Sequence, residues 1–225
     1  MFTTRFQAFV RRNAQRLARL MGRLPITPNQ VTVTGMLVTF VAAALVGLGN
    51  LLAGAIVLAF AGTFDILDGA LARATRRSYH YGAFLDSTTD RCAEGATYLG
   101  IAAYFLFQSP HGPWAKLAAL ACLAALGGSF LVSYVRARAQ SLGFTCDSGI
   151  FARPERVVVT VAGLILGRVV DDSWLAAVVV LLAVVTILTA LQRINEVWQQ
   201  ARDQRRPRDS EASSHAPSHG ERTAP

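Results

Sequence analysis

The chain of 225 residues is 52% hydrophobic and only 16% charged, with a mean hydropathy of +0.37. This is too apolar for an ordinary soluble domain of its length. The formal net charge is +8, but the arginines cluster at the ends of apolar runs, as the positive-inside rule requires of membrane proteins, so we do not expect a nucleic-acid partner. The 3 cysteines are widely separated and have no C-x-x-C spacing, which favours neither a disulfide framework nor a zinc site.

The N-terminal segment, residues 1–24, is rich in arginine and places Phe2, Phe6, Phe9 and Val10 between the basic residues. This pattern suits an amphipathic helix lying on an anionic membrane surface. A basic flank that only sets the membrane topology explains the same residues. The segment lacks the apolar core of a secretory signal, so it should stay attached.

Six apolar runs follow, and a helix that crosses a bilayer needs about 20 such residues. They cover approximately residues 30–49, 51–72, 82–107, 114–137, 155–170 and 174–194, and the fifth is the shortest. Arginines gather before the first run, in the breaks after the second and fourth, and after the sixth, whereas the alternate breaks carry only Lys116 and Arg168. The sequence therefore predicts an all-α integral membrane protein. Six transmembrane helices lie in residues 25–200, with both termini on the cytoplasmic side of the cell (inner) membrane.

The C-terminal segment, residues 201–225, is polar, contains proline and has almost no large apolar residue. Such a composition buries too little apolar surface to offset the entropy of ordering the chain, so we expect a disordered cytoplasmic tail.

Four aspartates interrupt the second and third runs. Asp65 and Asp68 lie near the end of the second run, and Asp86 and Asp90 lie near the start of the third. The i,i+3 and i,i+4 spacings place each pair on one helix face. Counted from the helix ends, both pairs reach depths of about 6 to 12 Å. A helical hairpin would bring the four carboxylates together just inside the cytoplasmic boundary.

This acidic cluster requires positive charge nearby. An acid in the middle of a membrane helix costs about 2.5 to 3.5 kcal/mol, and clustered anions also repel one another. Arginines close in sequence, Arg73, Arg76, Arg77 and Arg91, could supply the charge in a purely structural site. Two divalent cations are the better explanation, because Mg²⁺ and Mn²⁺ prefer carboxylate oxygens and serve phosphate chemistry.

Two glycines accompany the aspartates, Gly69 and Gly82. A glycine inside a helix costs about 1 kcal/mol relative to alanine, so its presence suggests close approach by a ligand. Gly69 and Ala72 would then form a small-residue floor, with Arg73 as a phosphate clamp. The alternative is that Gly69 and Ala72 only let two helices pack closely.

The spacing Asp65-x-x-Asp68-Gly69-x-x-Ala72-Arg73, followed after eight residues by Gly82-x-x-x-Asp86-x-x-x-Asp90, resembles the signature of the CDP-alcohol phosphotransferases at every defining position. The resemblance extends from TPNQVT at 27–32 to about Arg193. It implies six transmembrane helices, a homodimer and two divalent cations. It implies that Asp65, Asp68 and Asp86 bind the metals and that Asp90 is both general base and a further ligand. The implied contacts to the CDP-lipid are Asn29, Gln30, Val31, Thr32, Asp65, Asp68, Gly69, Ala72, Arg73 and Gly82.

The chemistry of this reaction agrees with the position of the acids. An alcohol is a poor nucleophile, so a carboxylate must take its proton as it attacks the β-phosphorus of CDP-diacylglycerol, while metals stabilise the departing CMP. A site at the membrane boundary admits the lipid donor laterally and a polar acceptor from the cytoplasm.

The signature does not specify the acceptor alcohol. The arginines in SYVRARA at 133–139 and RPER at 153–156, together with Arg193, lie on the side where the acceptor enters. If Arg136, Arg153 and Arg193 converge, they form a pocket for a second phosphate. Ordinary positive-inside arginines are the alternative explanation. Both stretches resemble those of prokaryotic phosphatidylinositol-phosphate synthases, which implies inositol 1-phosphate (1D-myo-inositol 3-phosphate) as acceptor.

Two other functions fit the sequence. A phosphatidylglycerophosphate synthase would also use an arginine pocket, for glycerol 3-phosphate. A transporter or membrane scaffold could use the aspartates as a cation path rather than for catalysis.

Overall fold

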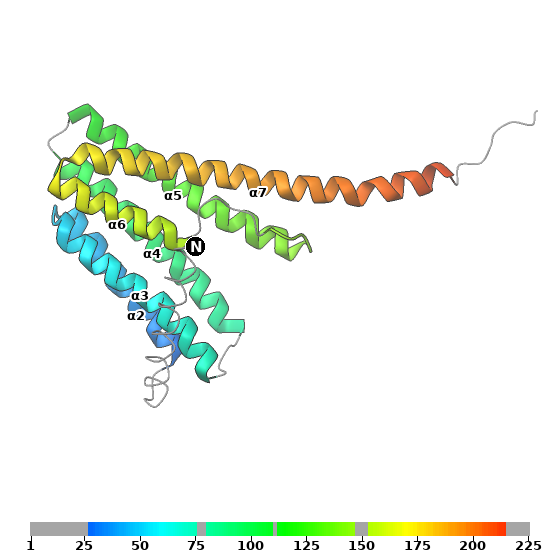
Figure 1. The fold of residues 1–225 in the computed structure, drawn as a ribbon, viewed down its shortest axis with the longest axis horizontal. Helices are drawn as coiled ribbons and strands as arrows, with labels where there is room; N and C mark the ends of the chain where they lie inside the picture. The colour runs from blue at the N-terminus through cyan, green and yellow to red at the C-terminus, as the bar shows by residue number, and fades with distance from the viewer. Residues whose placement is uncertain (1–26, 76–79, 110–111, 147–152, 215–225) are drawn as a thin grey trace, which may run out of the picture.

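The structure is a computed structural model, and it describes residues 27–75, 80–109, 112–146 and 153–214. These ranges contain helices and no strand, in agreement with the predicted all-α class (Figure 1). The helices are α2 (Pro28–Gly47), α3 (Leu51–Thr75), α4 (His80–Phe107), α5 (Gly112–Ser141), α6 (Arg153–Val169) and α7 (Asp172–Ser214). The predicted N-terminal amphipathic helix lies outside the described residues.

Helix α2 begins with a reciprocal cap. The Gln30 backbone N–H donates to the Thr27 hydroxyl at 3.3 Å, and the Thr27 N–H donates to Gln30 Oε1 at 2.9 Å. Pro28 occupies the first turn, where a missing N–H costs nothing. The helix ends at a tight turn in which Gly49 has a φ of 88°, a conformation that favours glycine. The chain then reverses directly into α3.

The helices form a closed ring of neighbours. Helix α2 packs against α3 and α4, α3 against α6, α6 against α7, α7 against α5, and α5 against α4. Within the described ranges α3 and α4 both lie beside α2 and do not pack directly on each other. The hairpin that the aspartates suggest is therefore a three-helix unit with α2 between its two arms.

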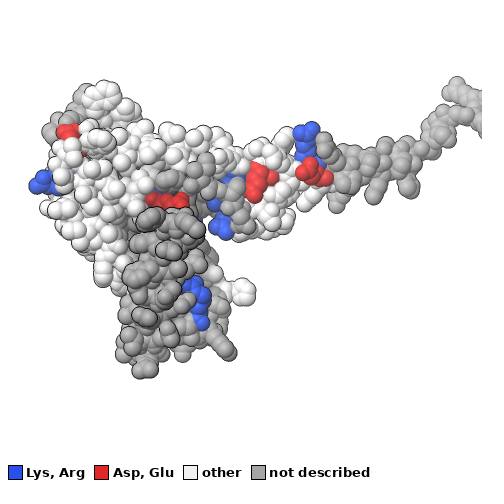
Figure 2. Space-filling model, viewed as in Figure 1, with Lys and Arg blue, Asp and Glu red and all other residues white. Residues whose placement is uncertain are grey.

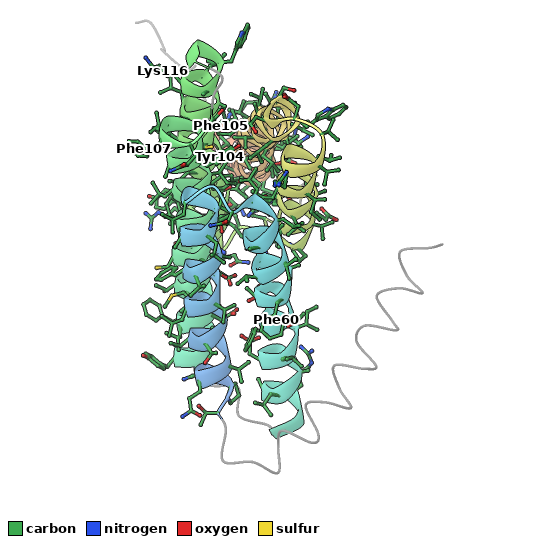
Figure 3. All side chains as sticks on the ribbon, turned by 90° about the vertical axis from the view of Figure 1, so that its left-hand side faces the viewer. Phe60, Tyr104, Phe105, Phe107 and Lys116 are labelled. Carbon is green, nitrogen blue, oxygen red and sulfur yellow. The ribbon has the colours of Figure 1, made fainter. Side chains whose placement is uncertain are left out.

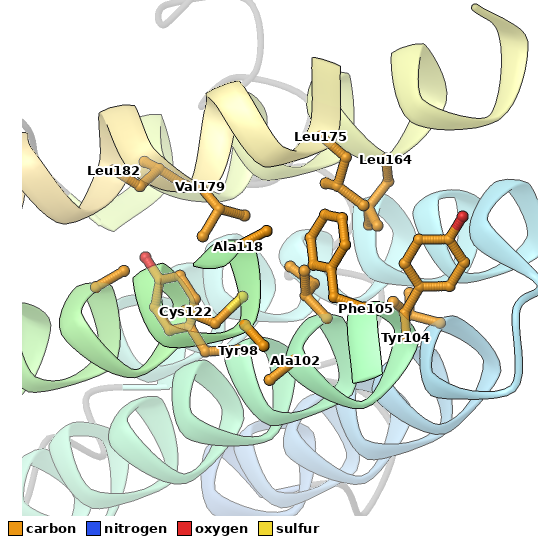
Figure 4. Packing of buried hydrophobic residues seen from close by; sticks show 14 of the residues in the cluster. Tyr98, Ala102, Tyr104, Phe105, Ala118, Cys122, Leu164, Leu175, Val179 and Leu182 are labelled. Atoms are coloured by element: carbon orange, nitrogen blue, oxygen red, sulfur yellow. The ribbon is translucent and has the colours of Figure 1, made fainter. Parts of the chain in front are cut away.

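The interior of the ring is filled by buried side chains from all six described helices. Figure 4 shows Tyr98 and Phe105 of α4 packed near Cys122 of α5 and beneath Leu175 and Leu182 of α7. Many other large apolar side chains remain exposed on the outer surface, including Leu37, Val41, Ile56, Phe60, Leu120 and Leu188. An outer surface of this kind suits contact with lipid rather than water.

Buried and exposed side chains alternate near the C-terminal end of α4. Tyr104 and Phe105 turn into the bundle, whereas Phe107 of α4 and Lys116 of α5 lie on the outer side of the bundle (Figure 3). The Tyr104 hydroxyl donates to Asp172 Oδ1 at 2.6 Å, and the Ser109 hydroxyl donates to Asp172 Oδ2 at 2.8 Å. These bonds join the end of α4 to the start of α7, at the opposite end of α4 from its aspartates.

Four of the described helices are long and apolar enough to cross a membrane, by length and composition. They span Pro28–Gly47, Leu51–Arg73, Trp114–Ser141 and Asp172–Gln204. Helix α4 carries Asp86, Asp90, Arg91 and Glu94 within its first turns, and α6 has only 17 residues. Four of the predicted six spans are thus found on these criteria.

Helix α7 extends well beyond the bundle (Figure 1). It stays helical to Ser214, through the first part of the segment for which the sequence predicts disorder. Arginine is the commonest residue of this stretch and is a good helix former, although the stretch also contains serines, aspartates and Pro207. Residues 215–225 lie outside the described part of the chain.

The contact between α2 and α4 should be sensitive to one added methyl group. A Cβ on Gly100 would collide with the backbone carbonyl of Ala43, whereas a Cβ on Gly127 would meet nothing within 4 Å. We expect Gly100→Ala to cost about 1 to 3 kcal/mol, because backbone cannot move aside. Gly127→Ala should be neutral or stabilise by up to about 1 kcal/mol. Unfolding midpoints in detergent measure both, and equal midpoints would contradict this packing.

Candidate active site

The structure brings carboxylates from two helices to one end of the bundle. Asp65 and Asp68 lie in the last turns of α3, and Asp86 and Asp90 lie in the first turns of α4. Asp68 is buried, Asp90 is half-buried, and Asp65 and Asp86 are exposed. The carboxylates of Asp65 and Asp86 are close enough to Asp68 to repel it electrostatically. Both helices therefore contribute carboxylates to the predicted cluster.

The carboxylates of the two helices are spread apart rather than arranged around one point. Among the described residues, no group of three His, Cys, Asp or Glu side chains lies in a metal-binding arrangement. Mutual repulsion favours this spacing, and the packing of both α3 and α4 on α2 permits it. The donor set still fits Mg²⁺ or Mn²⁺, because it consists of carboxylate oxygens on two facing helices. Metal binding by these aspartates remains a prediction.

Helix α2 contributes directly to the placement of Asp68. The Thr32 hydroxyl lies 2.6 Å from Asp68 Oδ2, to which it donates, and both side chains are buried. The same hydroxyl lies 3.1 Å from the Pro28 carbonyl. Thr32 belongs to the 29–32 segment that the sequence assigns to nucleotide binding, so this segment and the acidic pair of α3 are joined.

The two glycines have different surroundings at this end of the bundle. Within 4 Å of a Cβ built on Gly69, the nearest atoms all belong to the Arg73 guanidinium of the same helix, with Nη1 at 3.4 Å. Among the described residues no other helix comes within 4 Å of that Cβ, so helix packing does not explain this glycine. A Cβ on Gly82 would lie 3.3 Å from Asn29 Oδ1, so Gly82 allows close contact between α4 and the start of α2.

The predicted arginines also converge in part. Arg193 of α7 donates from Nη1 to the Val132 carbonyl of α5 at 2.9 Å. Arg136 and Arg156 are both near enough to act electrostatically on Arg193. Arg153 is the first residue of α6, but its side chain lies outside the described part. Arg136, Arg156 and Arg193 therefore lie in one region of the bundle, and binding of the acceptor phosphate there stays a prediction.

Sequence reasoning missed the buried ion pair between Glu94 and Arg156. Arg156 Nε donates to Glu94 Oε1 at 2.8 Å, and Nη2 donates to Oε2 at 3.4 Å. Both side chains are less than a tenth exposed. Glu94 follows Asp90 by one helical turn, and this spacing was the available signal. The partner could not be read from sequence, because it lies on α6.

A small cavity lies between Asp65 and the ion pair. It has a volume of about 40 Å³, and its lining mixes polar side chains such as Asp65, Glu94 and Arg156 with apolar ones such as Leu58 and Val157. A cavity of this size can accept water where polar groups line it. It joins Asp65 of α3 to Arg156 of α6.

An all-α bundle with membrane-length helices, facing carboxylate pairs and converging arginines defines a membrane enzyme class that handles phosphate esters. The chain belongs to the CDP-alcohol phosphatidyltransferase family, whose model matches residues 25–189.

Relatives with assigned activities cover most of the chain. It is 39% identical over 178 residues to the archaetidylinositol phosphate synthase of Methanothermobacter thermautotrophicus, covering 79% of this chain and 86% of the relative. It is 38% identical over 180 residues to the phosphatidylinositol phosphate synthase of Corynebacterium glutamicum, covering 79% and 80%.

Solved structures show the same fold. The phosphatidylinositol phosphate synthase of Mycobacterium tuberculosis with CDP-DAG bound matches with a TM-score of 0.76 and 34% identity, over 83% of this chain and 94% of that one. The complex of that synthase with manganese and citrate matches with a TM-score of 0.76 and 33% identity, over 82% and 88%.

The bond between Thr32 and Asp68 provides a test of the site's construction. Thr32→Val keeps the shape of the side chain but leaves a buried carboxylate oxygen without this donor, which should cost about 1 to 3 kcal/mol. Thr32→Ser retains the hydroxyl and is the matched control. Unfolding midpoints in detergent should place Thr32→Val below Thr32→Ser, and the reverse order would contradict the assigned bond.

Proposed function

We propose that this chain transfers a phosphatidyl group from CDP-diacylglycerol to inositol 1-phosphate (1D-myo-inositol 3-phosphate) and releases CMP. The observation that carries the proposal is the arrangement at one end of the bundle. Asp65 and Asp68 of α3 lie near Asp86 of α4, and a small cavity lined by Asp65 and by Arg156 of α6 leads toward arginines on α5 and α7. The reaction needs both halves, because it joins a diphosphate donor to a phosphorylated acceptor.

The donor half is built from α2, α3 and α4. The proposed contacts to the CDP part are Asn29, Gln30, Val31, Thr32, Asp65, Asp68, Gly69, Ala72, Arg73 and Gly82. The Arg73 guanidinium lies beside Gly69, so a diphosphate bound by this guanidinium would also come close to the helix backbone at the glycine. Gln30 also closes the cap of α2, so its side chain keeps this segment in place.

The proposed metal ligands are Asp65, Asp68, Asp86 and Asp90. The chemistry that two bound Mg²⁺ or Mn²⁺ ions supply is neutralisation of the phosphate oxygens and of the charge that develops on the departing CMP. Thr32 holds Asp68 in place for this role through its hydroxyl.

Asp90 is the proposed general base. The acceptor hydroxyl oxygen attacks the β-phosphorus of the donor and forms the new phosphodiester bond as its proton passes to the Asp90 carboxylate. The bond between the β-phosphorus and the oxygen bridging to the α-phosphate breaks, and CMP leaves with the electron pair. Asp90 is half-buried, and its Oδ2 lies 3.4 Å from Arg91 Nη2.

The acceptor half consists of arginines. Arg136, Arg153 and Arg193 are proposed to bind the phosphate of the acceptor, and the position of Arg156 near Arg193 adds it to this group. Guanidinium groups bind phosphate oxygens with two parallel hydrogen bonds, which gives orientation as well as affinity. The names of the relatives support inositol phosphate, while glycerol 3-phosphate remains the alternative for the same pocket.

The proposed membrane arrangement has six spans, with α4 and α6 added to the four apolar helices. Helix α6, with 17 residues, reaches the lower limit of a membrane span, and the charges of α4 lie in its first half. Both termini and the active site face the cytoplasm, because the arginines gather on that side. Residues 1–24 lie on the membrane surface, residues 25–200 form the catalytic domain, and two copies form a homodimer.

The acceptor can be identified by measuring CMP release from CDP-diacylglycerol and Mg²⁺ with inositol phosphate, free inositol, glycerol 3-phosphate and serine. We expect release with inositol phosphate in preference to the other three, because only a phosphorylated inositol matches both the pocket and the relatives. Preferential use of glycerol 3-phosphate would replace the acceptor. Lack of release with all four would favour the transporter or scaffold.

The base assignment predicts that Asp90→Asn lowers the rate of CMP release by about 10²- to 10⁴-fold, because the amide cannot take the proton. Asp203→Asn changes an exposed acid near the far end of α7 and should leave the rate unchanged. Manganese binding followed in the same samples shows whether the site is still assembled. A rate for Asp90→Asn equal to that of the wild type, with metal bound, would remove Asp90 from this role.

A further inference from the structure

The Glu94–Arg156 pair is too costly to be explained by stability alone. Removing two ions from water costs several kcal/mol per ion, and a hydrophobic pair of similar volume often stabilises a protein as well or better. Both partners are nevertheless buried, and their contact is side-on through Nε and Nη2. A side-on contact fixes the plane of the guanidinium as well as its position.

The pair also crosses the ring of helices. Within the described ranges α4 and α6 are not neighbours in the packing order, since α4 contacts α2 and α5 while α6 contacts α3 and α7. Glu94 therefore reaches Arg156 across the interior. In ordinary helix packing, apolar side chains fill the space between two helices that are not direct neighbours. Phe105, Leu164 and Leu175 do so nearer the C-terminal end of α4.

The position of the pair lies between the two halves of the site. Glu94 is one helical turn from Asp90, and the cavity beside the pair is also lined by Asp65. On the other side, Arg156 is close enough to Arg193 for mutual repulsion, as is Arg136. Three like charges converge here, and Glu94 supplies the anion that holds one of them. In Figure 2 the described upper part of the bundle is mostly white, with a few red and blue side chains.

We propose that Glu94 is a positioning residue, which orients the Arg156 guanidinium toward the phosphate of the acceptor alcohol and thereby sets the acceptor hydroxyl against Asp90. This inference rests on the proposed function and adds to it the residue that aligns the two substrates. Glu94 itself touches neither substrate. Its effect passes through Arg156.

A purely structural brace is the competing explanation, and two variants of the full-length protein separate it from positioning. Glu94→Gln keeps the size of the side chain and one acceptor oxygen but removes the charge. The double variant Glu94→Arg with Arg156→Glu restores an ion pair across the same gap with its polarity reversed. Asp203→Asn is the control for removal of a carboxylate elsewhere.

The assay is CMP release, with inositol phosphate varied at saturating CDP-diacylglycerol and then the reverse, together with the unfolding midpoint of each variant. We expect Glu94→Gln to raise KM for inositol phosphate roughly tenfold or more while KM for CDP-diacylglycerol stays unchanged. The reversed pair should restore the wild-type unfolding midpoint but not the wild-type KM for inositol phosphate, because the carboxylate introduced at position 156 would face the acceptor phosphate.

Three results would overturn the inference. The first is an unchanged KM for inositol phosphate in Glu94→Gln. The second is a lower unfolding midpoint and a lower kcat in Glu94→Gln with both KM values unchanged. The third is recovery of wild-type activity by the reversed pair. If Glu94→Gln does not fold, Arg156→Lys decides instead. It keeps the charge but loses the side-on contact, so it raises the acceptor KM under positioning and leaves it unchanged under bracing. Absence of CMP release by the wild type would reject the proposed function rather than the role of Glu94.

Discussion

The structure depends on the need to place four carboxylates at one end of an apolar bundle. Asp65, Asp68, Asp86 and Asp90 repel one another, and apolar surroundings make each charge more costly. Helix α2 manages this by lying between α3 and α4 and by donating a hydrogen bond from Thr32 to the buried Asp68. The acids therefore lie at one end of the bundle without being forced into contact, and their proposed role is to bind the cations that act on the CDP-lipid.

The bundle divides into two functional parts that follow the packing order. Helices α3 and α4 carry the four aspartates, while α5, α6 and α7 carry Arg136, Arg156 and Arg193. The donor is a membrane lipid and the proposed acceptor is a water-soluble phosphate ester, so a site divided between anions and cations suits both. The ion pair of Glu94 and Arg156 crosses between the parts, and the proposed alignment of the two substrates depends on it.

The sequence was informative where function depends on local spacing. The i,i+3 and i,i+4 intervals of the aspartates predicted their common helix faces, and the lengths of the apolar runs predicted the helices. Contacts between distant segments were not predictable: Thr32 with Asp68 and Glu94 with Arg156 are separated by 36 and 62 residues. The separation of α3 from α4 depends on close contacts such as that of Gly100 with Ala43, which no pattern along the chain specifies. The continuation of α7 to Ser214 shows that a polar composition alone does not exclude a helix.

The central claim is that the aspartates of α3 and α4 hold two divalent cations. The most direct test is a crystal structure of the full chain grown with Mn²⁺ and CDP-diacylglycerol, with diffraction recorded at the manganese absorption edge. The account predicts two anomalous peaks between α3 and α4, within coordination distance of Asp65, Asp68 and Asp86. Manganese bound elsewhere, or a bound CDP-lipid with no metal between these helices, would contradict it.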